Sequence, residues 1–435
     1  MHTQQIISLE KKDQYIYSIT IIGILFFTFG FVTWINGSLI QFLKIACQLR
    51  TDVQAFFVTF AFYMAYFFLA IPSAKILEKT GYKNGMALGL LVIAIGSLVF
   101  IPAANSRSFW LFLTGLFTQG AGLALLQTAS NPYITVIGPI ESAAKRISIM
   151  GICNKTAGII APLMLSALVL KNATTLEEKI KQTTDVAMKE NLLNELTGRI
   201  VTPYIIIAII LLLLSFLIKK SSLPEISDED ETGLASENVK TGKTSIFQFR
   251  HLILGVACIF LYLGVEVMAG DAIGIYGKAI GISTDETKYF TTFTLGAMLV
   301  GYIIGITVIP TYISQQVALK ISALLGVFFT TAVFFTTGYT AIIFIALLGL
   351  ANALMWPAIF PLAISGLGKF TAKGSALLVM GISGGAILPL IYAALKGPGV
   401  GLSNHLSFFI CMLPCYLYIL FYAASGYKVR GQKNY

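Results

Sequence analysis

Apolar segments long enough to cross a lipid bilayer recur along this chain, and no other feature of its sequence constrains the fold as strongly. A helix needs about 20 mainly apolar residues to span the hydrocarbon core of a bilayer. We identify twelve such segments, at residues 15–43, 53–77, 84–104, 108–136, 147–170, 201–218, 250–274, 287–311, 317–337, 338–366, 374–396 and 404–425. They predict an all-α membrane protein with twelve transmembrane helices.

The charged residues support this assignment by their scarcity and by their positions. Only 11% of the residues are charged and 56% are hydrophobic, whereas soluble domains carry about 25% charged residues. The net charge of +10 comes from Lys and Arg residues that lie mainly at the ends of the apolar segments. Such residues act as topology signals, so we expect a lipid-bilayer environment and no nucleic-acid partner.

Most of the 30 Lys and Arg residues fall on one side of the predicted membrane if the N-terminus is placed in the cytoplasm. Short cytoplasmic loops carry an excess of basic residues in membrane proteins. The distribution therefore predicts a multi-pass protein of the bacterial inner membrane with both termini cytoplasmic. We expect it to act as a monomer.

Two polar stretches interrupt the apolar pattern. Residues 171–200 are charge-balanced and helix-prone, and they predict an external loop with a short helix of its own. Residues 219–249 contain an acidic run followed by Gly and Ser, a composition that buries too little apolar surface to fold. We interpret this stretch as a cytoplasmic linker between an N-terminal six-helix bundle at 1–218 and a C-terminal six-helix bundle at 250–435.

The two bundles carry similar motifs at matching positions. Residues 150–163 read MGICNKTAGIIAPL in the fifth segment, and residues 380–390 read MGISGGAILPL in the eleventh. An amide residue, Gln127 in the fourth segment and Asn352 in the tenth, stands five residues before a proline. Duplicated halves around a central site are typical of secondary transporters. We therefore expect two pseudo-symmetric bundles with a site between them.

The turn after the second segment reads AKILEKTGYK at residues 74–83. It resembles the signature of the major facilitator superfamily, with a small residue followed by an acidic–basic pair and a Gly-basic pair. This resemblance implies a cytoplasmic gating loop formed by Glu78, Lys79, Gly81 and Lys83. The alternative is an ordinary solvated turn whose charges obey the topology rule.

Longer segments narrow the resemblance. Residues 26–44 (FFTFGFVTWINGSLIQFLK) and 126–155 (LQTASNPYITVIGPIESAAKRISIMGICNK) are similar to the fucose–galactose–proton symporter family. This family also holds the N-acetylglucosamine permeases, and residues 260–278 (FLYLGVEVMAGDAIGIYGK) fit its glucose/galactose branch. The resemblance implies the major facilitator fold and transport of a small sugar by alternating access.

The chain departs from this family at two positions. The fucose permeases carry an Asn-Asp pair in the first helix and a Glu in the fourth, and both carboxylates serve sugar binding and proton coupling. Here the corresponding residues are Asn36-Gly37 and Gln127, which carry no titratable group. The coupling ion, sodium or proton, therefore stays open at this point.

Several polar and aromatic residues lie inside the apolar segments, where lipid contact would be costly. Amides can bond sugar hydroxyls, and an aromatic face can cover the apolar face of a sugar ring. The alternatives are hydrogen bonds between helices for the amides and packing for the Trp residues. The predicted sugar-binding residues are Trp34, Asn36, Gln127, Asn131, Asn154, Lys155, Tyr262, Asn352 and Trp356.

Three charged residues stand inside predicted helices, with Lys155 and Glu266 near the middle of the membrane and Asp271 nearer the external end. Lys155 in the fifth helix needs a partner or water, and Glu266 and Asp271 in the seventh helix are the candidates. We predict that Glu266 and Asp271 serve ion coupling, either by taking up a proton or by contributing to a sodium site near Glu266. The alternatives are a fixed structural ion pair and, for Asp271, simple hydration.

The remaining reactive residue types point to no catalytic centre. The five cysteines lie in or beside apolar segments and resemble buried apolar residues. No zinc, nucleophile or nucleotide-binding motif is present, so we expect no cofactor, no metal other than a coupling ion, and no enzyme activity. The prediction is ion-coupled symport of a hexose or aminosugar. An uncoupled sugar carrier, a carrier of another small solute and a membrane sensor or receptor remain as alternatives.

Overall fold

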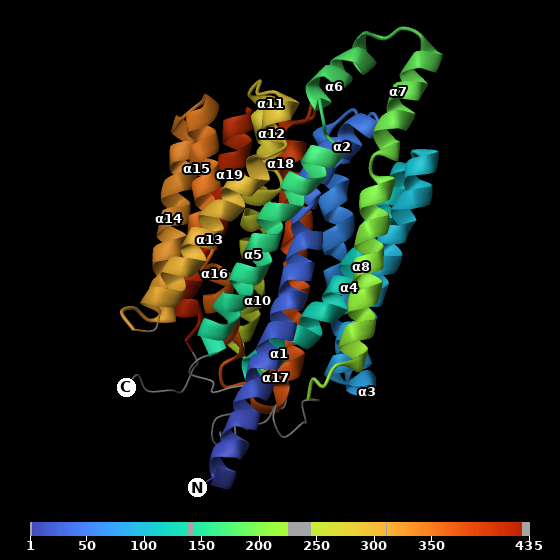
Figure 1. Cartoon of the computed structure of the whole chain (residues 1–435). Coiled ribbons are helices and arrows are strands. Elements are labelled where there is room, and N and C mark those ends of the chain that lie inside the picture. The colour runs from blue at the N-terminus through green and yellow to red at the C-terminus, as the bar shows by residue number, and fades with distance from the viewer. Residues whose placement is uncertain (1, 138–142, 225–244, 310, 429–435) are drawn as a thin grey trace.

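The computed structural model describes residues 2–137, 143–224, 245–309 and 311–428. These residues form a bundle of helices without any strand (Figure 1). Eleven described segments are long and apolar enough to cross a membrane, and one of them has 55 residues, enough to cross twice. The fold is therefore the predicted all-α membrane architecture.

The chain passes through the bundle from end to end, with its two termini at the same end (Figure 1). The helices of the first part of the chain are α1 (His2–Trp34), α2 (Asn36–Ala46), α3 (Asp52–Ser106), α4 (Phe109–Val136), α5 (Ala143–Leu168), α6 (Ala173–Gln182), α7 (Val186–Gly198) and α8 (Val201–Lys220).

The second part of the chain begins with a short 3-10 turn and continues through a second set of helices. They are η2 (Ile246–Gln248), α10 (Arg250–Gly270), α11 (Ile273–Ala279), α12 (Thr284–Thr287), α13 (Phe290–Val308), α14 (Gln315–Phe335), α15 (Gly338–Asn352), α16 (Met355–Ile364), η3 (Gly368–Phe370), α17 (Thr371–Met380), η4 (Gly381–Ser383), α18 (Gly384–Lys396), α19 (Asn404–Phe421) and η5 (Tyr422–Gly426).

Hydroxyl side chains begin several of the long helices. Thr51, Ser108, Ser314 and Ser403 each precede an apolar segment, and each accepts a hydrogen bond from an amide three residues later. An N-cap of this kind satisfies one of the free amides of the first helical turn. The starts of these helices therefore follow from the local sequence.

The second and third predicted segments form one helix, α3, that bends at Gly81. Gly81 has φ 75° and ψ 168°, which lies outside the helical region. Glycine adopts such a conformation without the steric cost that a side chain would add. The glycine of the predicted gating loop thus reverses the chain between two membrane crossings.

Several predicted segments are divided in the structure into two helices. The amides of Asp271 and Ala272 both bond the carbonyl of Val267, at 2.8 and 3.2 Å, where α10 gives way to α11. The first segment divides at Ile35 between α1 and α2, and the tenth divides between α15 and α16. Irregular backbone at membrane depth is tolerated where it faces protein or a cavity.

The polar stretch at 171–200 contains two helices, α6 and α7, where the sequence predicted one. The division falls where the Asp185 carboxylate accepts hydrogen bonds from the amides of Ala187 and Met188. An acidic N-cap starts a new helix at that point. Most of the predicted linker, residues 225–244, lies outside the described residues.

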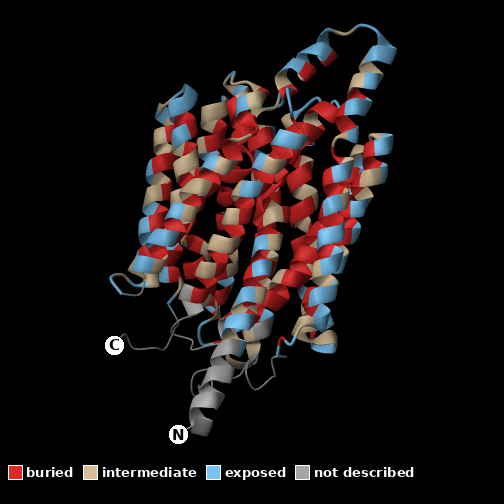
Figure 2. Cartoon of the chain, viewed as in Figure 1, coloured by how far each residue is buried: buried red, intermediate tan, exposed pale blue. Residues whose placement is uncertain are grey.

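Burial follows the pattern of a membrane protein (Figure 2). Buried residues fill the interior, while large apolar side chains such as Phe216 and Leu217 on α8 are 57% and 61% exposed on the outside. A soluble protein does not expose contiguous apolar surface on this scale. The outer surface is thus suited to lipid.

Candidate functional site

A cavity lies in the middle of the bundle, between helices of the first and second parts of the chain. It encloses about 680 Å³ of space unfilled by atoms, part of which is open to solvent. Its walls come from α1, α3, α4 and α5 on one side and from α10, α13, α16 and η4 on the other. The lining residues are Phe26, Phe29, Thr33, Trp34, Tyr63, Tyr66, Gln127, Asn131, Ile147, Gly151, Asn154, Lys155, Tyr262, Leu263, Glu266, Tyr302, Trp356 and Ile382.

The structure brings most of the sequence-predicted site residues together around this cavity. The residues concerned are Trp34, Gln127, Asn131, Asn154, Lys155, Tyr262, Glu266 and Trp356. Three tyrosines that the sequence analysis missed also line it, namely Tyr63 and Tyr66 from α3 and Tyr302 from α13. The predicted sugar-binding and ion-coupling residues all lie in the first, fourth, fifth, seventh and tenth segments, and nothing in the local sequence marks these tyrosines as inward-facing.

Lys155 and Glu266 form an ion pair across the cavity. The Lys155 Nζ lies 2.7 Å from Glu266 Oε1, and the two side chains are only 7% and 5% exposed. The pair joins α5 to α10, two helices from different parts of the chain. Of the two partners that the sequence offered for Lys155, Glu266 makes the direct contact.

Trp34 is held in a narrow slot beside this ion pair. Its Nε1 donates a hydrogen bond of 3.2 Å to Asn154 Oδ1, and the Lys155 Nζ lies 4.2 Å from the centre of its ring. A Cβ atom at Gly158 or Gly270 would stand only 2.6 or 2.5 Å from the indole ring. The glycines therefore make the room that positions the ring beside the cation.

The fourth helix contributes an amide face. Gln127 and Asn131 are four residues apart on α4 and both line the cavity, as expected for positions that share a helix face. The Gln127 Nε2 donates a 2.8 Å hydrogen bond to the Tyr66 hydroxyl. That bond leaves the carbonyl oxygen of the Gln127 amide available as an acceptor.

Three predicted residues do not line the cavity. Asn352 is fully buried, and its Oδ1 accepts a 2.8 Å hydrogen bond from the Tyr416 hydroxyl of α19. Asn36 and Asp271 are buried as well. The Asn36 amide has no hydrogen-bond partner in the described structure, and the Asp271 carboxylate faces the backbone amide of Gly37 without a side-chain donor. The expected mirror relation between Gln127 and Asn352 therefore does not extend to their surroundings.

The predicted gating loop lies at the end of the molecule that carries the termini (Figure 1). Glu78 and Lys79 are exposed there. The Lys83 Nζ donates a 3.4 Å hydrogen bond to the Ser221 carbonyl just after α8. The structure thus links this loop to the end of the sixth membrane crossing.

Comparison with known proteins gives the family. Residues 22–389 match the sequence profile of the Major Facilitator Superfamily. The chain belongs to the Major Facilitator Superfamily.

Two kinds of relative within the superfamily are similar over nearly the whole chain. A glucose/galactose transporter of Brucella abortus is 33% identical over 98% of this chain and 97% of its own length. The L-fucose-proton symporter of Escherichia coli is 28% identical over 87% of this chain and 86% of its own. These relatives are transporters, in line with the prediction of a carrier rather than an enzyme.

A solved structure shows the same fold. The crystal structure of the superfamily transporter FucP in its outward conformation superposes with a TM-score of 0.75 at 27% identity, covering 95% of this chain and 99% of FucP. The major facilitator fold predicted from the sequence is therefore confirmed. Among the described residues, no group of three or more His, Cys, Asp and Glu side chains is placed to hold a metal ion.

This superfamily member also has direct polar contacts between its two parts at the end opposite the termini, where α6 and α7 lie (Figure 1). We call this end the loop end and the contacts the loop-end clasp. The clasp comprises Gln41, Ser166, Leu170, Ala173, Thr174 and Glu177 from the first part and Lys278, Thr284, Asp285, Thr287 and Lys288 from the second.

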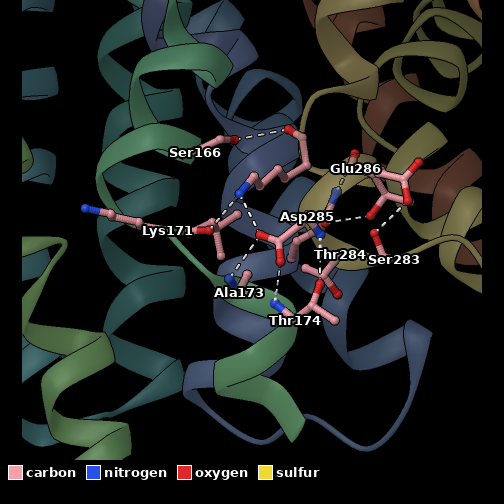
Figure 3. Close-up of polar contacts among 12 residues, drawn as sticks. Ser166, Lys171, Ala173, Thr174, Ser283, Thr284, Asp285 and Glu286 are labelled. Carbon is pink, nitrogen blue, oxygen red and sulfur yellow. Dashed lines mark hydrogen bonds and ion pairs between the residues drawn. The ribbon is translucent and has the colours of Figure 1, made fainter.

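Asp285 caps a helix that belongs to the other part of the chain (Figure 3). Its carboxylate accepts hydrogen bonds of 3.1 Å from the amides of Ala173 and Thr174, the first two residues of α6. Asn172, which precedes α6, makes no side-chain cap of its own. The first turn of α6 is thus satisfied by a charged acceptor only while the two parts meet.

Lys288 and Gln41 extend the clasp toward the interior. The Lys288 Nζ donates to the Leu170 carbonyl at 3.0 Å and lies 2.7 Å from Asp285 Oδ1. The Gln41 Nε2 donates to the Thr287 carbonyl at 3.0 Å. These buried contacts show that the loop end is closed in this structure.

Glu177 on α6 receives two lysines at the outer edge of the clasp. Lys181 and Lys278 each lie 2.9 Å from its carboxylate, and Thr284 donates to it as well. Burial alone raises the pKa of Glu177, but these hydrogen bonds and charges outweigh burial and lower the pKa from 4.5 to about 2. The carboxylate is therefore ionised in the clasp at any physiological pH.

Proposed function

We propose that this protein is a secondary active transporter that carries a hexose or aminosugar, such as glucose, galactose or N-acetylglucosamine, by ion-coupled symport with alternating access. One observation carries the proposal. Amides, aromatic rings and a charge pair meet around one central cavity between the two parts of the chain. Ligand sites combine apolar walls with a few well-placed polar groups in this way.

The cavity offers the contacts that a sugar requires. Trp34 and Trp356 line it and present large apolar faces, and the Gln127, Asn131 and Asn154 amides provide donors and acceptors for hydroxyl groups. The names of the similar proteins, glucose/galactose transporter and L-fucose-proton symporter, support a monosaccharide over other small solutes.

The closed loop end gives the proposed transport cycle one of its states. The basic residues of the chain favour a cytoplasmic location for both termini, which would place the loop end outside the bacterial inner membrane. In the proposed cycle the clasp opens to admit sugar from outside and closes before the sugar leaves toward the cytoplasm. The residues 1–218 and 250–435 would then act as two six-helix bundles that rock about the cavity, in a monomer.

Coupling to an ion is the second element of the proposal. The L-fucose-proton symporters among the similar proteins favour a proton over sodium. Gln127 and Gly37 cannot take up a proton, so the coupling group must be another carboxylate. Glu266, at the cavity, and Asp271, five residues later, are the buried carboxylates of α10 and its C-terminal end.

Uptake into proteoliposomes tests this function. Purified protein should accumulate one member of a radiolabelled sugar panel when a proton or sodium gradient is imposed, and a non-metabolised competitor should block the uptake. Equilibration without accumulation would reduce the protein to an uncoupled carrier. Absence of flux for every sugar, with binding retained, would instead favour a membrane sensor or receptor.

A further inference from the structure

Asp271 is a buried carboxylate with no cation or side-chain donor in contact. It stands at the end of α10 and is only 1% exposed, and the one donor that faces its carboxylate is the backbone amide of Gly37 in the described structure. Buried carboxylates are normally paired with a cation or satisfied by several donors. Asp271 therefore lacks something that its surroundings in this state do not supply.

A count of the nearby charges shows what is missing. The charged groups that act electrostatically on Asp271 are Glu266 and Lys155. The Tyr63 side chain of α3 interacts electrostatically with both Asp271 and Glu266. The lysine already makes its 2.7 Å contact with Glu266. One buried cation thus faces two carboxylates, and a single added positive charge would make the group neutral.

The neighbours that bury Asp271 come from the other part of the chain. The preceding residue, Gly270, packs against the Trp34 ring, and a Cβ atom at Gly37 would stand 2.2 Å from Thr291 Oγ1 of α13. Gln41, one helical turn after Gly37 on α2, donates to the Thr287 carbonyl across the same interface between the two parts. Opening the loop-end clasp would remove these neighbours and admit water to Asp271.

We propose that Asp271 takes up the coupling cation while the loop end is open, and that this cation must be bound before the loop end can close. This inference rests on the ion-coupled symport proposed above. Closing over an ionised and unpartnered carboxylate is strongly unfavourable, whereas closing over a neutralised one is not. Glu266 then has a different role, as the fixed partner of Lys155.

A proton suits this site better than a sodium ion. Hard metal cations in proteins are held by several oxygen ligands, whereas a proton needs only the carboxylate that binds it. In the described structure the Asp271 carboxylate faces the Gly37 backbone amide, which is a donor and cannot ligate a metal ion, and no oxygen ligand is found beside it. Uptake converts the carboxylate to a neutral carboxylic acid, and release to the cytoplasm restores it.

The test compares Asp271→Asn with the wild type in proteoliposomes, using the sugar that the wild type exchanges fastest. The carboxamide imitates the neutral acid but cannot exchange a proton. We expect sugar counterflow within about threefold of wild type, no accumulation above equilibrium under a pH gradient, and no sugar-coupled proton uptake by an internal pH dye. Glu195→Gln, an exposed carboxylate on α7 paired with Arg199, should match the wild type in all three assays.

The possible outcomes distinguish a failure of the Asp271 assignment from a failure of the proposed symport function. If the wild type exchanges sugar but accumulates none under a proton or sodium gradient, the proposed symport function is itself wrong. If the Asp271→Asn variant accumulates sugar to the same level as the wild type, Asp271 is not the residue that binds the coupling cation. If only a sodium gradient drives accumulation, and the Asp271→Asn variant loses it, Asp271 remains the coupling site but the cation is sodium and not a proton. A folded Asp271→Asn protein that neither binds nor exchanges sugar also overturns the proposal, because a neutral side chain should permit closing.

A second measurement keeps Asp271 intact, so it does not depend on whether the Asp271→Asn variant folds. Spin labels at Val186 of α7 and at Thr337 before α15, both exposed, would report the width of the loop end in a protein whose native cysteines are replaced. With Asp271 intact, the closed fraction should rise as the pH falls from about 8 to about 5. A closed fraction that responds to neither pH nor sodium would contradict the inference.

Discussion

The central ion pair and the loop-end clasp both join the two parts of the chain, but they differ in burial and in number. Lys155 and Glu266 make one contact with side chains that are 7% and 5% exposed. The clasp spreads its contacts over many groups, and Glu177 and Asp285 are 18% and 36% exposed. Removing one partner from a buried pair leaves an uncompensated charge, whereas partly exposed pairs contribute little each.

This difference indicates that the two regions have different roles, with the clasp as a gate and the central ion pair as a fixed contact. The clasp combines a few buried hydrogen bonds with partly exposed ion pairs, and many such small contacts can break and reform as a group, which suits a gate. A single buried pair near the centre moves least when two bundles rock against each other. We therefore expect the pair to persist through the cycle while the clasp opens, and the following experiments test that contrast.

The largest effect is expected at the central pair. Lys155→Met should lower the free energy of unfolding by about 3–5 kcal/mol, because Glu266 is left buried without its cation. Exchange should fall by at least about 100-fold, since the Trp34 ring also loses the cation beside it. Thermal unfolding and counterflow measure the two effects.

A double variant separates stability from transport at this pair. Lys155→Met with Glu266→Leu removes both charges, and buried pairs replaced by apolar residues often regain stability. The melting temperature should recover while exchange stays low. Recovery of exchange as well would show that the pair only holds the bundles together.

An intermediate effect is expected for the amide face of the cavity. Gln127→Ala should weaken sugar binding by about 10- to 100-fold, the value of one or two hydrogen bonds to a buried polar ligand. Isothermal titration measures the affinity. The matched control is Gln119→Ala on the same helix, because Gln119 donates to Ser97 and does not line the cavity. Equal losses in both variants would remove Gln127 from the sugar site.

A smaller effect is expected in the clasp. Asp285→Ala removes the cap of α6 and should shift the open–closed equilibrium toward the open state by about 1 kcal/mol, roughly fivefold. The labels at the loop end measure this shift. Asp185→Ala removes a comparable cap from α7 within one part of the chain, and it should leave the equilibrium unchanged.

The smallest effect near neutral pH concerns Glu177. Its pKa is lowered in the closed clasp to about 2 from 4.5, so its contribution to closing is fully present above pH 4.5 and is lost as the pH falls toward about 2. Glu177→Gln should therefore not change the pH dependence of closing between about pH 5 and about pH 8. A changed pH profile in that range would assign to the clasp the pH response that we attribute to Asp271.

The comparison also shows which parts of the site the sequence could predict. Gln127, Asn131, Trp34 and Lys155 stand out because polar or aromatic groups in apolar segments need a reason, and all four line the cavity. Tyr63 and Tyr302 could not be found in the same way, because a tyrosine is ordinary in a membrane helix. Asn352 met the same criterion as Gln127, yet its side chain lies away from the cavity and accepts a hydrogen bond from the Tyr416 hydroxyl of α19.

The amino-acid sequence alone determined that this protein crosses the membrane many times, because apolar length and charge position act locally along the chain. Only the tertiary structure decided that Glu266 pairs with Lys155, that Asp285 caps α6, and that Asp271 is buried without a cation in contact. Each of these depends on residues more than 100 positions apart meeting, or failing to meet, across two packed bundles. The relative rotation and depth of helices set such contacts, and no local pattern of residues encodes them.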